Sequence, residues 1–134
     1  MSNLAGLKVM VIDDAATPRR AAEIYLAGPK DNSSGIIVNT VANGFDAIPV
    51  IYSFKPDIIF LDVMMPKVEG FAICKALKQN EALKGIKVIM LTSKNGLFDR
   101  AKAQDAGADD YVEKPFKRDT ILLIVAKHAP SRFT

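Results

Sequence analysis

The sequence has only one cysteine, Cys74, so no disulfide can form within the chain. This excludes the disulfide-stabilised class of small secreted domains and favours a reducing compartment. No apolar run approaches the roughly 20 residues that a membrane-spanning helix needs. The first residues, MSNLAGLKVMVIDD, lack the charged start and the long apolar stretch of a signal peptide. These absences predict a soluble, cytoplasmic protein that does not act at a membrane.

An excess of charge of one sign is also missing. The chain has 18 basic and 15 acidic residues, a formal net charge of +3, and no block of five like charges. So small and scattered an excess gives no support for nucleic-acid binding. Hydrophobic residues make up 49% and charged residues 25% of the chain, an ordinary mixture for a globular protein. The length suits one folded unit, so we expect a single domain over residues 1–134.

Short β-branched segments alternate along the chain with segments of helical periodicity. The expected strands are 9–12, 36–41, 58–61, 88–91 and 111–112, and the expected helices are 17–26, 44–54, 70–79, 97–106 and 119–129. Five strands alternating with five helices predict an α/β fold, a parallel sheet with helices on both faces. Segments 9–12, 58–61 and 88–91 are apolar throughout, as expected for strands that are buried on both faces.

Turn and capping residues mark the ends of these elements. Thr17 followed by Pro18 predicts the start of the first helix, with Thr17 as the N-cap. Gly107 predicts the end of the fourth helix. Residues 27–35, AGPKDNSSG, form a longer run of turn formers than a helix-to-strand connection usually has. We assign this run to a surface loop without a chemical role.

Polar side chains follow four of the five expected strands, at the point where each strand ends. In chain order they are Asp13 and Asp14, Asp62, Thr92 and Ser93, and finally Glu113 and Lys114. Parallel strands all point in one direction, so these side chains should converge on one edge of the sheet. Open α/β sheets bind their ligands at that edge. The sequence therefore predicts a site there.

Carboxylates brought this close together raise one another's pKa or recruit a cation. Oxygen ligands that are open to water suit Mg²⁺, which keeps several waters and leaves room for phosphate oxygens. An aspartate beside such a metal can attack phosphorus as a nucleophile. We therefore interpret Asp62 as the residue that becomes phosphorylated. Lys114 would neutralise charge on the transferred group, and Thr92 would donate a hydrogen bond to it.

Each of these residues also has an ordinary structural explanation. The pair Asp13 and Asp14 could equally well cap a helix, and Thr92 with its neighbour is more often a cap than a phosphate ligand. An isolated Lys114 is usually a solvated surface lysine. The interpretation as a site depends on finding all of them at the same ends of successive strands in so short a chain.

The sequence resembles the receiver domain of bacterial two-component response regulators. The matching segments are the pair at 13–14, DVMMPKVEG at 62–70, LTSK at 91–94 and GADDYVEKPF at 107–116. The resemblance extends over nearly the whole chain and its motifs are specific in combination. It implies a flavodoxin-like, doubly wound (βα)5 fold with the strand order 2-1-3-4-5.

The resemblance also implies a role for each acidic residue. Asp62 corresponds to the phosphoacceptor, which takes a phosphoryl group from a phosphohistidine on a sensor histidine kinase or phosphotransfer protein. Asp13 and Asp14 correspond to the acidic pair. Together with Asp62 and the backbone carbonyl of Met64, they would organise Mg²⁺.

Three further positions match the family's pattern. Lys114, which precedes a proline that is cis in the family, would pair with the acyl phosphate. Thr92 and Tyr111 correspond to the switch pair, in which the hydroxyl moves toward the phosphoryl group and the aromatic ring follows inward.

In the family, the positions of Met64 and Lys94 influence the attack of water on the acyl phosphate. We expect the bulky Met64 to slow self-dephosphorylation.

Residues 93–102, SKNGLFDRAK, are similar to single-domain receivers of chemotaxis-like systems that control type IV pilus motility. Few residues follow the last expected helix, so we expect the output to be a contact surface rather than a further domain. The fourth helix, fifth strand and fifth helix would change with phosphorylation and bind a target protein or a second copy of the chain.

The last expected helix has an inward stripe and two flanks. At 100° per residue, the inward positions are Ile121, Leu122, Val125, Ala126 and Ala129. Leu123 and Ile124 lie on the flanks, where they contribute either to a partner contact or to a wide core stripe. Two other residues are given structural roles only: Cys74 as a core thiol and His128 as a solvated residue at the helix end.

Two other classes of protein share parts of this pattern. The first, which is the alternative to a signalling switch, is a Mg²⁺-dependent phosphatase with an aspartyl nucleophile. In this chain, however, Asp62 is followed by Val63 and Met64 rather than by a second acid. A flavin-binding electron carrier needs a phosphate loop rich in Ser, Thr and Gly after the first strand, where this chain has two acids instead. We therefore predict a signalling switch that catalyses only its own phosphotransfer and dephosphorylation.

Overall fold

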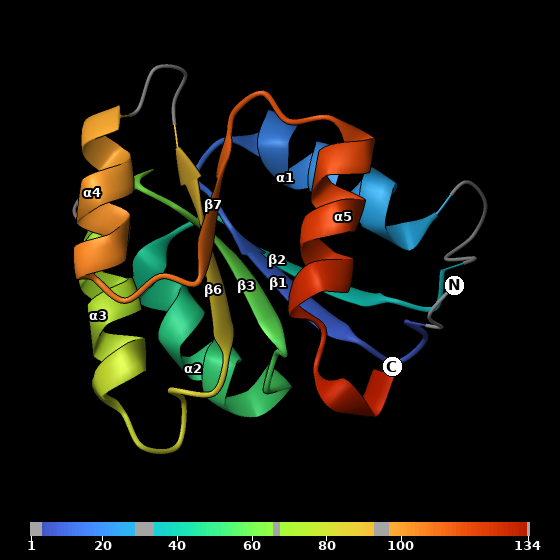
Figure 1. Ribbon diagram of the computed structural model, residues 1–134, viewed down its shortest axis with the longest axis horizontal. Coiled ribbons are helices and arrows are strands. Elements are labelled where there is room, and N and C mark those ends of the chain that lie inside the picture. Colours follow the sequence, from blue (N-terminus) through green and yellow to red (C-terminus); the bar gives the residue numbers. More distant parts are fainter. Residues whose placement is uncertain (1–3, 29–33, 66–67, 93–96, 134) are drawn as a thin grey trace.

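The computed structural model describes residues 4–28, 34–65, 68–92 and 97–133 (Figure 1). The sheet strands are β1 (Lys8–Ile12), β2 (Ile37–Val41), β3 (Ile58–Asp62), β6 (Lys87–Thr92) and β7 (Asp110–Glu113). The helices are α1 (Ala16–Ala27), α2 (Gly44–Phe54), α3 (Gly70–Gln79), α4 (Leu97–Asp105) and α5 (Arg118–His128), followed by the short 3-10 helix η1 (Ser131–Phe133). Two short strands, β4 (Met64–Met65) and β5 (Val68–Glu69), pair with each other outside the main sheet.

The five sheet strands are all parallel and lie in the order β2-β1-β3-β6-β7. Counted without the short β4 and β5, this is the order 2-1-3-4-5. The flavodoxin-like α/β fold expected from the sequence is therefore confirmed. The expected strands and helices all occur, and none of their ends differs from the prediction by more than one residue.

Helices cover both faces of the sheet, with α1 and α5 on one face and α2, α3 and α4 on the other (Figure 1). Successive residues of β1 point to opposite faces. Met10 and Ile12 pack in the core on the α2–α4 face, while Val9 and Val11 pack on the α1–α5 face. This arrangement explains why the central strands are apolar without alternation. Cys74 is fully buried on the α2–α4 face, as predicted.

The start of α1 differs from the prediction. The N-cap position is Ala15, which has no side-chain cap, and Thr17 lies inside the first turn. Instead, a carboxylate oxygen of Asp13 accepts a hydrogen bond from the Ala15 N–H at 2.9 Å. The prediction of Thr17 as the N-cap is wrong because this aspartate already shapes the turn into the helix.

Two predicted turns can be compared with the structure. Gly107 follows α4 with a φ of +88°, the left-handed conformation that favours glycine after a helix. The expected loop at 27–35 is described only at its two ends, since residues 29–33 lie outside the described part of the chain. At its far end, Ser34 Oγ donates to the Leu26 carbonyl at 2.6 Å and accepts from the Ile36 N–H at 3.1 Å.

Helix α5 buries a narrower stripe than predicted. Ile121 and Val125 are fully buried, while Ala126 is exposed, contrary to the prediction. The buried stripe is centred between Ile121 and Val125, and Ala126 lies about 120° from that centre on a helical wheel. Leu123 is 72% exposed, whereas Ile124 is half-buried and packs against the core. Across the described residues, no helix combines the length and the apolar character needed to cross a bilayer.

Candidate functional site

Three aspartates lie together at the edge of the sheet where the strands end. Asp13 follows β1 and Asp62 ends β3, and these two strands are parallel neighbours that pair Ile12 with Leu61. One carboxylate oxygen from each of Asp13, Asp14 and Asp62 lies within 4.8 Å of the others. Asp13 and Asp62 are buried and Asp14 is exposed. The acid cluster is therefore open to water on the side of Asp14.

Lys114 reaches this cluster from the end of β7. Its Nζ lies 3.0 Å from Asp62 Oδ1 and 3.1 Å from Asp13 Oδ2, so one ammonium group bridges two buried carboxylates. The Lys114 N–H donates to the Thr92 carbonyl at 2.7 Å, which holds the end of β7 against β6. The peptide bond between Lys114 and Pro115 is cis, as the resemblance implied.

Burial raises the pKa of Asp62 to about 7. The hydrogen bond from Lys114 opposes this shift, and the charge of Asp13 reinforces it. Burial by itself lowers the pKa of Lys114, but its hydrogen bonds to Asp62 and then Asp13 outweigh that effect and raise it above its ordinary value. The charged form of Asp62 is therefore costly, and a cation near it would offset part of that cost.

The donor set of the acid cluster fits a hard divalent cation. Three carboxylates supply oxygen ligands only, and the exposed Asp14 leaves one side free for water or phosphate oxygens. Nitrogen or sulfur ligands, which softer metals prefer, are not part of this cluster. Asp13, Asp14 and Asp62 are therefore the described residues that can hold a metal ion here.

The connection from β3 to α3 packs tightly against Asp62. The Gly70 N–H donates to the Val63 carbonyl at 3.0 Å, and any Cβ on Gly70 would overlap the Asp62 carbonyl oxygen. Glycine is therefore required where the helix begins. Met64 lies beside the carboxylate, since its N–H donates to Asp62 Oδ1 at 3.4 Å, and the residue is 71% exposed.

Thr92 and Tyr111 lie on neighbouring strands. Thr92 ends β6 and is fully buried, and its hydroxyl donates to the Val112 carbonyl at a long 3.5 Å. Tyr111 is half-buried and packs against the core on the α2–α4 face. Its ring is covered by Arg100, whose guanidinium carbon lies 4.6 Å from the ring centroid. Ser93 and Lys94 lie outside the described part of the chain.

The structure adds contacts that the sequence did not suggest. Arg19 Nη1 donates to the backbone carbonyl of Asp13 at 2.7 Å. Glu113 was expected at the site but accepts a hydrogen bond from Arg100 at 3.0 Å and is not part of the acid cluster. His128 was expected to be solvated, yet its side chain is 11% exposed and lies 2.9 Å from Asp110. None of these contacts has a characteristic spacing in the sequence.

Comparison with known proteins gives a consistent result. A family model described as the response regulator receiver domain matches residues 9–126. Protein PilG of Pseudomonas aeruginosa is 47% identical over 126 residues, which cover 94% of this chain and 90% of PilG. The alkaline phosphatase synthesis transcriptional regulatory protein PhoP of Bacillus subtilis is 37% identical over 81% of this chain, and the match covers 42% of PhoP.

Solved structures with the same fold include proteins of similar length. The chemotaxis protein CheY4 of Vibrio cholerae superposes with a TM-score of 0.81 at 27% identity, covering 92% of this chain and 99% of that one. The response regulator DrrB of Thermotoga maritima gives a TM-score of 0.76 at 30% identity, with 90% of this chain and 51% of that one covered.

Proposed function

Because the chain belongs to the response regulator receiver domain family, we propose that it is a phosphorylation-dependent signalling switch, a single receiver domain over residues 1–134. A receiver domain is a signalling module rather than a conventional enzyme, and it works with a histidine kinase. Asp62 is the residue that we assign as phosphoacceptor. The observation that carries this assignment is the cluster of Asp13, Asp14 and Asp62 with Lys114 bridging two of the three acids.

In the proposed reaction, a carboxylate oxygen of Asp62 attacks the phosphorus of a phosphohistidine on a sensor histidine kinase or phosphotransfer protein. A new oxygen–phosphorus bond forms while the phosphorus–nitrogen bond breaks, and the histidine nitrogen keeps the electron pair. Lys114 already lies 3.0 Å from Asp62 and can pair with the oxygens of the incoming group. Bound Mg²⁺, held by Asp13, Asp14, Asp62 and the Met64 carbonyl, would supply neutralisation of the phosphoryl charge.

We assign the switch to Thr92 and Tyr111. Among the described residues, the Thr92 hydroxyl makes a single hydrogen bond, a long one of 3.5 Å to the Val112 carbonyl, so little is lost when it turns toward a phosphoryl group. A phosphoryl group shifts a conformational equilibrium only through contacts that differ between the two states. A new hydrogen bond from Thr92 would be such a contact, and inward movement of the Tyr111 ring would follow it.

The surface that would carry this change to a target is formed by α4, β7 and α5. Leu123 on α5 is 72% exposed and supplies an apolar side chain for contact with a target protein or a second copy of the chain. The similarity to PilG, together with the resemblance of residues 93–102, supports a role in signalling that controls pilus motility. We propose that the protein acts in the cytoplasm.

Intact mass spectrometry tests the phosphoacceptor directly. After incubation with acetyl phosphate and Mg²⁺, the wild-type protein should gain one phosphoryl group, and Asp62→Asn should gain none. Asp119→Asn, which changes an exposed aspartate in the first turn of α5, serves as the matched control and should be labelled like the wild type. An unlabelled wild type, or equal labelling of Asp62→Asn, would contradict the proposal.

A further inference from the structure

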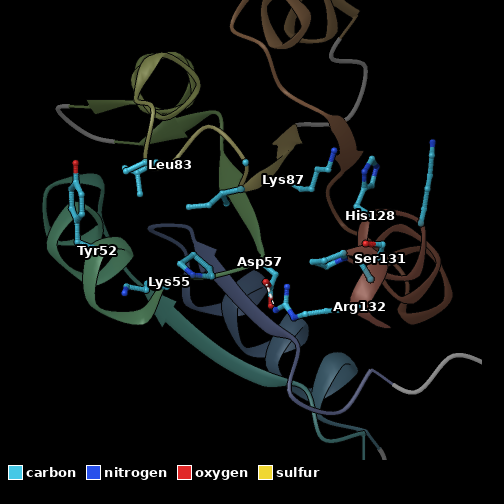
Figure 2. Close-up of a pocket in the computed structure, with 15 residues that line it drawn as sticks. Tyr52, Lys55, Asp57, Leu83, Lys87, His128, Ser131 and Arg132 are labelled. Atoms are coloured by element: carbon cyan, nitrogen blue, oxygen red, sulfur yellow. Dashed lines mark hydrogen bonds and ion pairs between the residues drawn. The ribbon is translucent and has the colours of Figure 1, made fainter. Parts of the chain in front are cut away.

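A cavity of about 860 Å³ lies at the edge of the sheet opposite the acid cluster. It is walled by the connections that lead into β3 and β6 and by the end of α5 with η1. Figure 2 shows Tyr52, Lys55 and Leu83 on one side of it and Ser131 and Arg132 on the other. Its volume is in the range of small-molecule sites, roughly 300–1,000 Å³. Nothing in the proposed phosphotransfer uses this cavity.

Two of the basic side chains at the rim of the cavity form ion pairs with aspartates that are largely buried. Arg132 is 60% exposed and lies 2.6 Å from Asp57, whose side chain is only 12% exposed. Lys127 is 69% exposed and lies 3.5 Å from Asp110, which is 18% exposed. Each cation is therefore positioned by a carboxylate that is largely covered. The face that meets an approaching ligand is basic.

The remaining charges extend this basic rim. Lys87 is 46% exposed and lies 3.9 Å from Asp109, which is 22% exposed. Lys55 is exposed, and no acidic side chain among the described residues is within ion-pair distance of it. Within the described part of the chain, Asp57 is the only acid that lines the cavity, and Arg132 already pairs with it. The lining thus has a clear excess of positive charge.

The floor of the cavity is apolar. Pro56 is buried, and Leu83, Ile86 and Pro130 are half-buried. Tyr52 lies at one end of the cavity and is 50% exposed, so it is available for contact with a ligand. An inorganic anion would use only the rim, whereas an anion with an apolar or planar body would use both the rim and the floor.

We propose that this cavity is a binding site for an organic phosphate of nucleotide size. The phosphate groups would lie on Lys87, Lys127 and Arg132, and the organic part would lie against Leu83 and Ile86. The site is at the far end of the strands from Asp62. A ligand here would therefore not compete with phosphorylation and would give the protein a second input.

Isothermal titration calorimetry with ATP as the probe tests this proposal. The titration is done at low salt in the presence of EDTA, so that no metal can bridge the nucleotide to the acid cluster. We expect ATP to bind with a dissociation constant below 1 mM, and inorganic pyrophosphate and adenosine each to bind at least about tenfold more weakly. Amide NMR shifts should move at the non-proline residues of 55–57 and 127–132.

A matched pair of double variants separates the site from general charge attraction. Lys87→Gln with Lys127→Gln removes two cations of the rim, while Arg20→Gln with Lys75→Gln removes two exposed cations elsewhere. The first pair should weaken ATP binding at least about tenfold, and the second should change it less than about twofold. No ATP binding, equal weakening by both pairs, or pyrophosphate binding as tight as that of ATP would each overturn the proposal.

Discussion

Arg100 lies against the face of Tyr111, with its guanidinium carbon 4.6 Å from the ring centroid. The same guanidinium donates to Glu113 at 3.0 Å, so Arg100 joins α4 to two positions of β7. A cation over an aromatic ring stabilises the arrangement in which the Tyr111 ring keeps its half-buried position beneath Arg100. If the ring moves inward when Asp62 is phosphorylated, this contact must break. Arg100 then favours the unphosphorylated state.

Replacing Arg100 should therefore make the switch easier to turn on. An exposed cation–π contact is worth about 0.5–1 kcal/mol. We expect Arg100→Met to increase the rate of phosphorylation by acetyl phosphate about two- to fivefold. Glu113→Gln is the control, because it removes the ion pair but leaves the cation over the ring, and it should have a smaller effect. A rate in Arg100→Met at or below that of the wild type would contradict this role.

The pKa of Asp62 predicts how stability depends on pH in the metal-free protein. Its folded pKa is about 7 against an ordinary value of 3.8, so the folded state binds this proton more tightly than the unfolded state. This contribution to stability is complete below pH 3.8 and is lost as the pH rises through about 7. Asp62→Asn removes the buried charge. It should raise the free energy of unfolding at pH 8 by about 2–4 kcal/mol.

Urea unfolding of wild type and Asp62→Asn between pH 5 and pH 8 measures this difference. The gap between the two proteins should widen with rising pH and should narrow when Mg²⁺ is added to the wild type. A gap that does not change with pH would show that the charge of Asp62 is not the cause.

Lys114 should be needed for stability as well as for phosphotransfer. Its ammonium group is the cation that bridges Asp13 and Asp62 in the structure. Removing one partner of a buried ion pair leaves an uncompensated charge, which costs about 3–5 kcal/mol. Lys114→Met should lose about 3 kcal/mol in urea unfolding at pH 8 without metal, and less at pH 5, where Asp62 is protonated. Lys75→Met, at an exposed lysine of α3, should change the free energy of unfolding little. An equally small loss of stability in Lys114→Met would argue against the bridge between the two carboxylates.

Met64 is expected to control how long the phosphoryl group stays on Asp62. Its N–H contacts the Asp62 carboxylate, and the residue is 71% exposed. Met64→Asn replaces an apolar side chain by one that can hold water, so loss of phosphate should accelerate several-fold. The reaction can be followed by intact mass after the donor is removed. Leu123→Asn, at another exposed apolar position, should leave the lifetime of the phosphorylated protein unchanged. If both substitutions accelerated loss of phosphate, the effect would not be specific to Met64 and the prediction would be wrong.

The fold and the acid cluster could be predicted because both follow from regular features of the chain. Apolar segments at 9–12, 58–61 and 88–91 identified the central strands, and parallel strands bring their ends to one edge. Parallel strands place Asp13, Asp62 and Lys114 at the same edge of the sheet, where Lys114 bridges the two acids. The direction of the strands predicts the shared edge, whereas the strand order that makes these residues neighbours was implied by the family resemblance.

Contacts that depend on side-chain conformation could not be predicted in the same way. Arg19 bonds a backbone carbonyl six residues earlier, and Arg100 spans thirteen residues to reach Glu113. His128 and Asp110 lie eighteen residues apart and meet because α5 packs beside β7. Long side chains have many rotamers, and packing selects one of them. Neither hydrophobic periodicity nor a spacing rule contains that information.

The pairing of Arg132 with Asp57 has a practical consequence. Asp57 also accepts a hydrogen bond from the Lys8 N–H at 3.0 Å, so the C-terminal segment is anchored to the first strand rather than hanging away from the domain. An affinity tag or sensor-chip linker joined directly to η1 would lie beside the basic cavity and crowd it. The aspartate-bearing end of the molecule would then face bulk solution, so this mode of capture suits kinase measurements and is a poor choice for nucleotide measurements.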